Sequence, residues 1–240
     1  MKKRIVLFSI IFFGWCFAAL AQNFNVTFQI DMSVQIAKKT FDPAADKIQV
    51  RGSFNGWGTT DMAPTATGSK IYSVIVAVPT GPAAYKFFFK HGSNDVWESD
   101  QATPSKNRES SITAATTLPV VFFNNETMPT GADANVTFKA DMRLPLKQKD
   151  LLKTPTPGKV FAAGDFNGWN TTATELTDAD GDSIYTKTEV IKSAQLINYK
   201  FLYGNKTGGT AWENDPNKTA WIVDGNQDVA RFYNNVNPKV

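Results

Sequence analysis

Two kinds of side chain in this sequence have types and spacings that suit ligand binding. Trp57 follows Asn55-Gly56, a strong turn signal, and Trp97 follows a polar segment that begins at His91. We expect both indoles to lie on loops, where a partly exposed aromatic ring is unfavourable unless it binds something. An indole plane packs against the apolar face of a ring, while a nearby amine or amide bonds to hydroxyl groups on its rim. This chemistry suits a sugar.

The second kind is a lysine within an aromatic run, Tyr85-Lys86-Phe87-Phe88-Phe89. Alternate side chains of a strand point to opposite faces, so Lys86 points away from the face that Tyr85, Phe87 and Phe89 share. We interpret Lys86 as part of the same ligand site. The alternative is a solvated lysine on an exposed sheet face.

These features occur twice in the same order. Gly52-Ser53-Phe54-Asn55-Gly56-Trp57 recurs as Gly164-Asp165-Phe166-Asn167-Gly168-Trp169, Tyr85-Lys86-Phe87 as Tyr199-Lys200-Phe201, and Trp97-Glu98 as Trp212-Glu213. The offset drifts by only a few residues, which indicates two versions of one domain. We predict a first repeat at residues 22–126, a linker at 127–133 and a second repeat at 134–240.

The elements between the turn signals read as short strands rich in β-branched and aromatic residues. In the first repeat these are residues 47–51, 72–78, 85–89 and 118–123, while residues 33–39 and 146–152 have room only for single helical turns. The sequence therefore predicts an all-β protein with two β-sandwich domains in tandem. One tryptophan of each repeat closing the end of its sandwich is the structural alternative to a binding role.

The motifs Gly-x-Phe-Asn-Gly-Trp, Tyr-Lys-Phe, Trp-Glu-x-Asp and Asn-Arg, in this order, resemble the starch-binding domains of carbohydrate-binding module family 20. They are also similar to the glycogen-binding relatives in family 48, and the resemblance implies immunoglobulin-like sandwiches. It implies one α-glucan site per repeat, with two stacking tryptophans, a lysine that contacts hydroxyl groups and an asparagine. The matching residues are Trp57, Lys86, Trp97 and Asn107 in the first repeat and Trp169, Lys200, Trp212 and Asn217 in the second.

Two positions depart from the family pattern. The segment Ser105-Lys106-Asn107-Arg108 lacks the Asp-Pro that the second repeat keeps in Asp215-Pro216-Asn217-Lys218, where lysine replaces arginine. Trp221 has no counterpart in the first repeat, and it either widens the second site or packs against its neighbours. We expect a free-standing binder that is able to associate with a glycan-degrading enzyme or a cell-surface complex.

Residues 1–21 have the features of a secretory signal: a basic start, an apolar run and small residues before the expected cleavage at Gln22. Removal of Lys2, Lys3 and Arg4 from the 25 basic residues leaves 22, equal to the 22 acidic residues. The apolar run is shorter than a membrane span requires, so we expect no span in the mature chain. The predicted location is periplasmic, extracellular or cell-surface associated.

Composition excludes several function classes. The neutral mature chain disfavours nucleic-acid binding, which needs basic surface to neutralise phosphates. Cleavage removes Cys16, the only cysteine, and His91 is the only histidine, so thiol chemistry and multi-histidine metal sites are excluded. We expect no cofactor and no metal.

Three other hypotheses compete with a glycan site. One is a structural or protein-interaction module of the cell surface, because a fold does not fix function. A small glycosidase using Glu98 and Glu213 is disfavoured by the size of the domains, and we predict a protein without enzymatic activity. Asp178, Asp180 and Asp182 alternate as in a calcium loop, but no glutamate follows at the required spacing, which favours an acidic turn.

Overall fold

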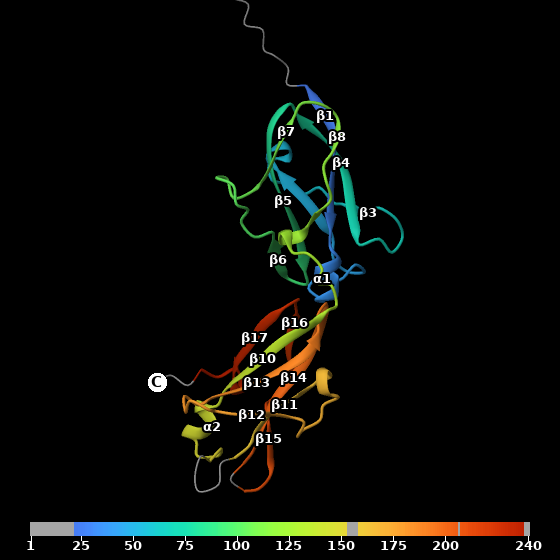
Figure 1. The fold of residues 1–240 in the computed structure, drawn as a ribbon. Helices are drawn as coiled ribbons and strands as arrows, with labels where there is room; N and C mark the ends of the chain where they lie inside the picture. The colour runs from blue at the N-terminus through green and yellow to red at the C-terminus, as the bar shows by residue number, and fades with distance from the viewer. Residues whose placement is uncertain (1–21, 153–157, 206, 238–240) are drawn as a thin grey trace, which may run out of the picture.

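The protein is described here from a computed structural model that covers residues 22–152, 158–205 and 207–237. The predicted signal segment lies outside the described residues. Figure 1 shows two β-rich bodies in tandem, and every described strand pairs only with strands of its own repeat. The predicted all-β fold with two β-sandwiches is confirmed. No helix in the described part of the chain is long and apolar enough to cross a membrane.

The first repeat consists of two sheets packed face to face. One sheet has the order β3-β4-β1-β8, with β9 also paired to β1, and the other has the order β2-β5-β6, with β7 also paired to β5. The elements are β1 (Asn23–Asp31), α1 (Ser33–Ala37), β2 (Ile48–Gly52), β3 (Ala63–Pro64), β4 (Ile71–Pro79), β5 (Gly81–His91), β6 (Asn94–Trp97), β7 (Arg108–Ile112), β8 (Thr116–Thr117) and β9 (Val121–Phe122).

The second repeat has the same arrangement with different edge strands. One sheet has the order β13-β10-β17, and the other β12-β11-β14-β15, with β16 also paired to β14. The elements are β10 (Asp133–Asp141), α2 (Arg143–Lys147), β11 (Val160–Gly164), β12 (Thr174–Leu176), β13 (Ile184–Lys192), β14 (Gln195–Gly204), β15 (Thr210–Trp212), β16 (Lys218–Ile222) and β17 (Asn226–Phe232).

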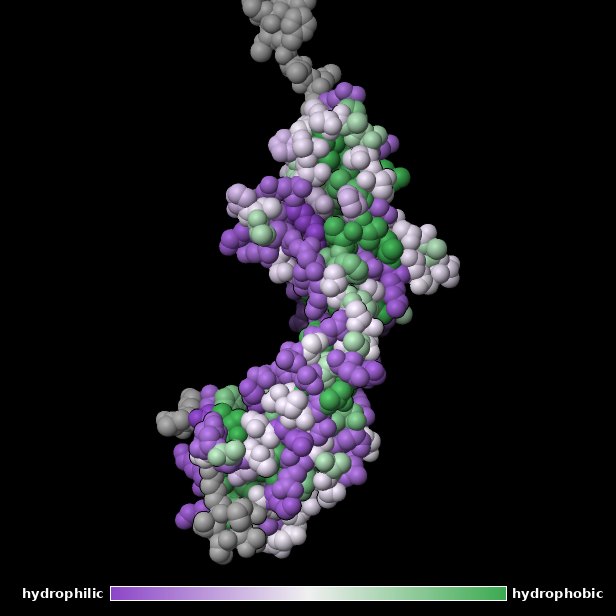
Figure 2. All heavy atoms as spheres, in the orientation of Figure 1, coloured by the Kyte–Doolittle hydropathy of each residue, from purple (hydrophilic) through white to green (hydrophobic). Residues whose placement is uncertain are grey.

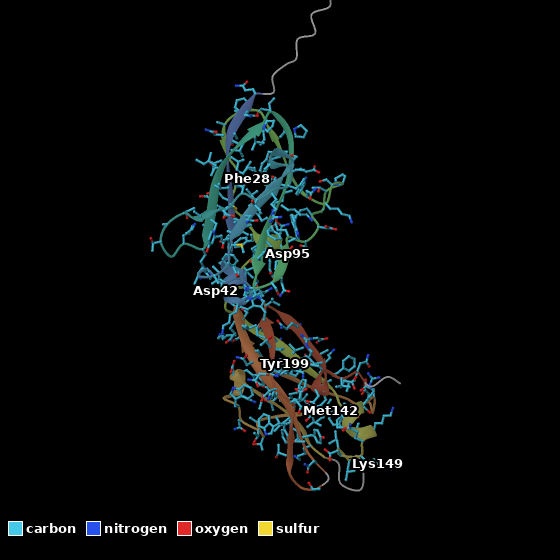
Figure 3. The ribbon with its side chains drawn as sticks, turned by 180° about the vertical axis from the view of Figure 1, so that it is seen from behind. Phe28, Asp42, Asp95, Met142, Lys149 and Tyr199 are labelled. Atoms are coloured by element: carbon cyan, nitrogen blue, oxygen red, sulfur yellow. The ribbon has the colours of Figure 1, made fainter. Side chains whose placement is uncertain are left out.

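The two sheets of each repeat enclose an aromatic core. Phe28 on β1 lies with its ring centroid 4.9 Å from those of both Phe54 and Tyr85, which come from the opposite sheet and its adjoining turn. In the second repeat Phe138 is 5.5 Å from Tyr199. Phe28 and Tyr199 are both fully buried and lie inside their repeats in Figure 3. Burial of these large rings stabilises each sandwich by the apolar area removed from water.

One predicted strand is shorter in the structure than expected, and one helical turn is shifted. Of residues 118–123 only Val121–Phe122 is a strand, because Pro119 has no N–H for a ladder and the chain turns at Phe123 into a 3₁₀ turn. Phe123 packs inward, with its ring centroid 5.2 Å from that of Phe89. The helical turn predicted at 146–152 lies at Arg143–Lys147.

The segment predicted as a linker is hydrogen-bonded to the second repeat. The Thr130 backbone N–H donates to Asp224 at 2.9 Å, and the Gly131 N–H donates to the Ser193 hydroxyl at 3.0 Å. The Ser193 hydroxyl also donates to Asp224. This bond, and next the bond from the Thr130 N–H, hold the pKa of Asp224 below its usual value. The segment before β10 is therefore anchored to the turns that precede β14 and β17.

Candidate functional site

The central strand of the second sheet in each repeat carries the candidate lysine on its outward face. In the first repeat, β5 buries Tyr85, Phe87 and Phe89 in the core, and Lys86 points to the other side, as alternation predicts. The register places Lys86 opposite Arg51 on β2. Lys86 therefore lies in the middle of an exposed sheet face.

Trp97 reaches this face from the neighbouring strand. The expected loop position is wrong for Trp97, because it is the last residue of β6, just as Trp212 is the last residue of β15. Trp97 lies opposite Phe88, two residues along β5 from Lys86 and on the same face. The two rings are in contact, with centroids 4.8 Å apart and planes inclined by 58°. The indole of Trp97 is nevertheless 41% exposed, so one side of its ring is free to pack against a ligand.

Asn107 lies beside the lysine at the start of another strand. Arg108, the first residue of β7, pairs with Tyr85, so one step further along the ladder places Asn107 next to Lys86. The Asn107 backbone is held by Ser105 and Thr103, whose hydroxyl donates to its carbonyl at 2.7 Å. Within the described residues nothing bonds to the side-chain amide of Asn107, which is available to a ligand.

Trp57 lies in the turn that follows β2, the strand on the other side of β5 from β6. After β2 a 3₁₀ turn at Ser53–Asn55 leads to Gly56 and Trp57, and the Trp57 N–H donates back to Gly52 at 2.9 Å. Trp57 has φ of 62°, a left-handed conformation that is unfavourable for a bulky residue. Trp169 has φ of 60° at the matching position. Strain of this kind, kept in both repeats, is typical of functional positions.

The Asn side chain within each Asn-Gly turn explains how the chain holds this conformation. Asn55 accepts the Gly52 N–H at 2.9 Å and donates to the carbonyls of Val50 and Gly58. Asn167 makes the equivalent bond to Gly164 at 3.0 Å. The Asn-Gly-Trp motif is therefore a turn whose amide fixes the place of the indole that follows.

The lysine of each site is oriented by a carboxylate. The Lys86 amino group lies 3.0 Å from Asp100, which also pairs with Lys106 at 3.3 Å. Hydrogen bonds from Lys86 and then Lys106 lower the pKa of Asp100. Lys200 pairs with Asp215 in the same way. The ammonium group has three N–H donors, so it can hold this carboxylate and still bond to a ligand hydroxyl.

The second repeat brings three of its predicted residues, Lys200, Trp212 and Asn217, together at the same register positions. Trp212 lies opposite Leu202, and Lys218 lies opposite Tyr199, so Asn217 comes next to Lys200. Trp212 is 39% exposed, close to the 37% of Trp57, and Trp169 is half-buried. The structure thus places the lysine, the asparagine and one tryptophan of each repeat on one sheet face, and places Trp57 and Trp169 in the turns that follow β2 and β11.

Trp169 is held by a bond that the first repeat lacks. Its indole N–H donates to Asp165 at 3.1 Å, and Asp165 also accepts the backbone and side-chain N–H groups of Asn198 at 2.7 and 2.9 Å. Burial raises the pKa of Asp165, but these bonds outweigh it and keep that pKa below its usual value. The matching residue in the first repeat, Ser53, accepts the Ala84 N–H at 3.2 Å as its one hydrogen bond within the described residues. The sequence shows this as the one substitution within an otherwise identical motif.

No protein-family model matches the chain, and no curated protein sequence matches it. Among solved structures, the chain is similar to a glycoside hydrolase family 15 glucoamylase from Hypocrea jecorina, with 18% identity and a TM-score of 0.35 over 55% of this chain and 22% of that one.

The chain is also similar to a γ-CGTase from alkalophilic Bacillus clarkii, with 12% identity and a TM-score of 0.31 over 77% of this chain and 23% of that one. A third similarity is to a maltogenic amylase from S. marinus, with 13% identity and a TM-score of 0.23 over 81% of this chain and 28% of that one. The chain thus spans less than a third of the length of each. These TM-scores are too low to support an argument, so the resemblance to starch-binding domains rests on the motif residues.

Glu98 and Glu213, the carboxylates of the glycosidase hypothesis, are buried inside the sandwiches. Glu98 accepts hydrogen bonds from Arg108, from the Phe87 N–H at 2.9 Å and from the Asn124 N–H at 3.2 Å. Lys218 pairs with Glu213, which also accepts two backbone N–H groups. The repeated Trp-Glu and Asn-Arg or Asn-Lys motifs therefore contain a buried ion pair. The Glu carboxylates are fully engaged in holding strands together.

The acidic turn and Trp221 are two further features that the sequence singles out. The carboxylates of Asp178, Asp180 and Asp182 lie within 4.8 Å of one another, and Asp178 accepts the Ser183 N–H at 3.2 Å. Trp221 lies opposite Leu196 on β14, and the Lys38 amino group of the first repeat is 5.9 Å from its ring centroid. The register puts Trp221 on the same outward face of β14 as Lys200, and its two considered roles, widening the site and packing, both stay predictions.

Proposed function

We propose that this protein is an exported, non-catalytic carbohydrate-binding protein in which each repeat binds an α-glucan such as starch, glycogen or a maltooligosaccharide. The observation that supports it best is the shared geometry of the two repeats. In both, a lysine and an asparagine adjoin across a strand ladder, an exposed tryptophan follows on the next strand, and a second tryptophan occupies a left-handed turn. Tryptophans that only packed inside the sandwiches would not need to be exposed at matched positions in both repeats.

The proposed binding mode follows from the chemistry of these groups. Each indole packs against the apolar CH face of a glucose ring, and the lysine and asparagine donate hydrogen bonds to hydroxyl groups on its rim. Asp100 and Asp215 hold the lysines in place, so little side-chain entropy is lost when the sugar binds. Two tryptophans on opposite sides of one lysine suit a curved chain.

Export is part of this proposal and is supported by the signal features of residues 1–21. Two sites on one chain also raise the apparent affinity for a long polysaccharide. A short connection gives an effective concentration in the millimolar range, so avidity of about 10²-fold or more is expected on a multivalent chain.

Affinity electrophoresis tests the proposal directly. The mature protein is run through gels that contain amylose, glycogen, a cellulose-derived glucan or no polysaccharide, beside the double variant Trp57→Ala/Trp169→Ala. The matched control is Ile75→Ala/Val190→Ala, which removes one highly exposed apolar residue per repeat from the opposite sheets.

We expect retardation of the natural protein and of the control by amylose and glycogen only, and free migration of the tryptophan variant. Equal mobility of the natural protein in every gel would overturn the proposal and favour the structural or protein-interaction module. Unchanged retardation of a folded tryptophan variant would overturn the site assignment.

A further inference from the structure

The first repeat has a hollow of about 420 Å³ on the same outward face as Lys86, lined in part by Phe88, whose ring contacts Trp97. Most of its lining comes from β2, β5 and the turns next to them, and its charged residues are Asp46, Lys47, Arg51 and Lys90. The Asp46 carboxylate is almost fully buried and bonds to His91 Nδ1 at 2.7 Å. On the face drawn in Figure 2, hydrophilic side chains cover much of both repeats, so hydrophilic surface alone does not distinguish this hollow. The hollow is distinguished by one cation, Arg51, that has no carboxylate partner among the described residues.

Arg51 is held in a fixed position by packing and by one acceptor. Its guanidinium carbon lies 3.8 Å from the ring centroid of Phe88 and 5.2 Å from that of Trp97. Nε and Nη2 donate to the Gln49 side-chain oxygen at 3.1 and 2.7 Å. Within the described residues nothing accepts a hydrogen bond from Nη1. A guanidinium fixed on one edge therefore presents its other edge to the hollow.

The other cations of the hollow are neutralised. Lys47 pairs with Asp61 at 3.6 Å, and Lys90 pairs with Asp95 at 3.1 Å, the residue labelled in Figure 3. Arg51 has no carboxylate within ion-pair distance among the described residues. Arginine keeps its charge at all ordinary pH values, and its fork matches the paired oxygens of a phosphate or carboxylate.

The second repeat has no such group at the matching positions. The register places Ala163 opposite Lys200, where the first repeat has Arg51 opposite Lys86. Phe161 and Leu202 replace Gln49 and Phe88 as the adjacent pair. Among the described residues, the equivalent surface of the second repeat therefore lacks an unpaired arginine, and the nearby Lys159 is paired with Glu175 at 2.7 Å.

We infer that the first repeat contains an anion subsite in which Arg51 binds a phosphate monoester or a carboxylate carried by the sugar next to the one stacked on Trp97. The subsite makes the first repeat selective for anionic α-glucan, and the second repeat binds neutral glucan. This inference rests on the proposed function of the tryptophan site. It adds a distinct ligand class to one of the two repeats.

The test uses the mature chain with Trp169→Ala and Trp212→Ala, so that the first repeat alone reports binding. Dissociation constants are measured for amylopectin that carries phosphate monoesters, for the same material after phosphatase treatment, and for amylose oxidised to carboxylate at C6. Arg51→Gln and Arg51→Lys are compared with the control Arg231→Gln, an exposed arginine whose one hydrogen bond in the described residues is to the Ala230 carbonyl.

We expect about tenfold tighter binding of at least one anionic glucan than of the neutral one, reduced by 0.5 M NaCl. Arg51→Gln should abolish this preference and leave neutral binding unchanged, Arg51→Lys should retain part of it, and the control should retain all of it. Preference for only the phosphorylated or only the oxidised glucan identifies which anion the subsite takes.

If the first repeat with its natural Arg51 binds all three glucans with equal affinity, the anion subsite is overturned, while the proposed function is not. An equal loss of neutral and anionic binding in a folded Arg51→Gln protein would also overturn it, because Arg51 would then act only as a support for Phe88 and Trp97. Failure to bind any of the three would overturn the proposed function and this inference with it.

Discussion

Arg108 donates to both carboxylate oxygens of Glu98 inside the first repeat, with its Nη2 2.6 Å from Oε1 and its Nε 3.0 Å from Oε2. The same Nη2 also donates to the Phe122 carbonyl at 2.9 Å. The pair thus joins the end of β6, the start of β7 and the end of β9. A charge pair so completely buried holds the strands around the site in register, whatever its net contribution to stability.

Arg108→Ala should therefore destabilise the first repeat strongly. The substitution leaves the Glu98 carboxylate buried without a cation, and the free energy of unfolding should fall by about 3–5 kcal/mol. Urea unfolding followed by tryptophan fluorescence measures the change. Arg231→Ala, at an exposed arginine, should change it by less than about 0.5 kcal/mol. Similar small effects of both substitutions would contradict a structural role for the buried pair.

The Lys86–Asp100 pair should make the proposed glucan binding by the first repeat resistant to acid. Hydrogen bonds from Lys86 and Lys106 lower the pKa of Asp100 from 3.8. Because this pKa lies below 3.8, the Asp100 carboxylate stays ionised and paired with Lys86 above pH 3.8 and becomes protonated only as the pH falls through the lowered pKa. Calorimetric titration should therefore give constant affinity from pH 7 to 4.5, with a decline only below 3.8. Asp100→Asn should weaken binding by up to about fivefold at pH 7. A fall in affinity already at pH 5 would contradict this assignment.

Asp165 acts as a positioning residue for Trp169. Asp165→Asn should weaken binding by the second repeat severalfold, because the acceptor for the indole N–H is replaced by a weaker one. The matched substitution in the first repeat, Ser53→Ala, should have little effect there, since Ser53 bonds only to the Ala84 N–H.

The pH profile separates this role from a purely structural one. The pKa of Asp165 lies below its usual value, so the bond to Trp169 should persist until the pH falls below that value. The Trp169 contribution to fluorescence should shift at that pH in the natural protein and show no such transition in Asp165→Asn. A transition that remains in the variant would rule out Asp165 as its source.

Local pattern was enough to predict the parts of the site that depend on one strand or one turn. Alternation along β5 predicts the outward direction of Lys86, and the Asn-Gly dipeptide predicts the turn that holds Trp57. The sandwich followed from the spacing of strands and turns. In each case the controlling interactions lie within a few residues along the chain.

Features that depend on register between distant strands were not predicted. Arg51 is brought next to Phe88 and Trp97 only by the pairing of β2, β5 and β6. The partnership of Glu98 with Arg108 had a visible signal, because an acid and a base recur at matched positions in both repeats. The Trp221 contact with Lys38 depends on how the repeats meet, which no periodicity within one repeat encodes.

The two sites should cooperate on long glucans and act independently on short ones. Trp97→Ala removes the exposed indole of the first repeat and leaves the second intact, so the apparent affinity for amylose should fall by about 10²-fold through loss of avidity. For maltoheptaose, which occupies one site, titration should instead show half the stoichiometry with unchanged affinity at the remaining site. Trp212→Ala should give the mirror result. If each substitution changes amylose and maltoheptaose binding by the same factor, the repeats do not engage one chain together, and the tandem arrangement serves another purpose.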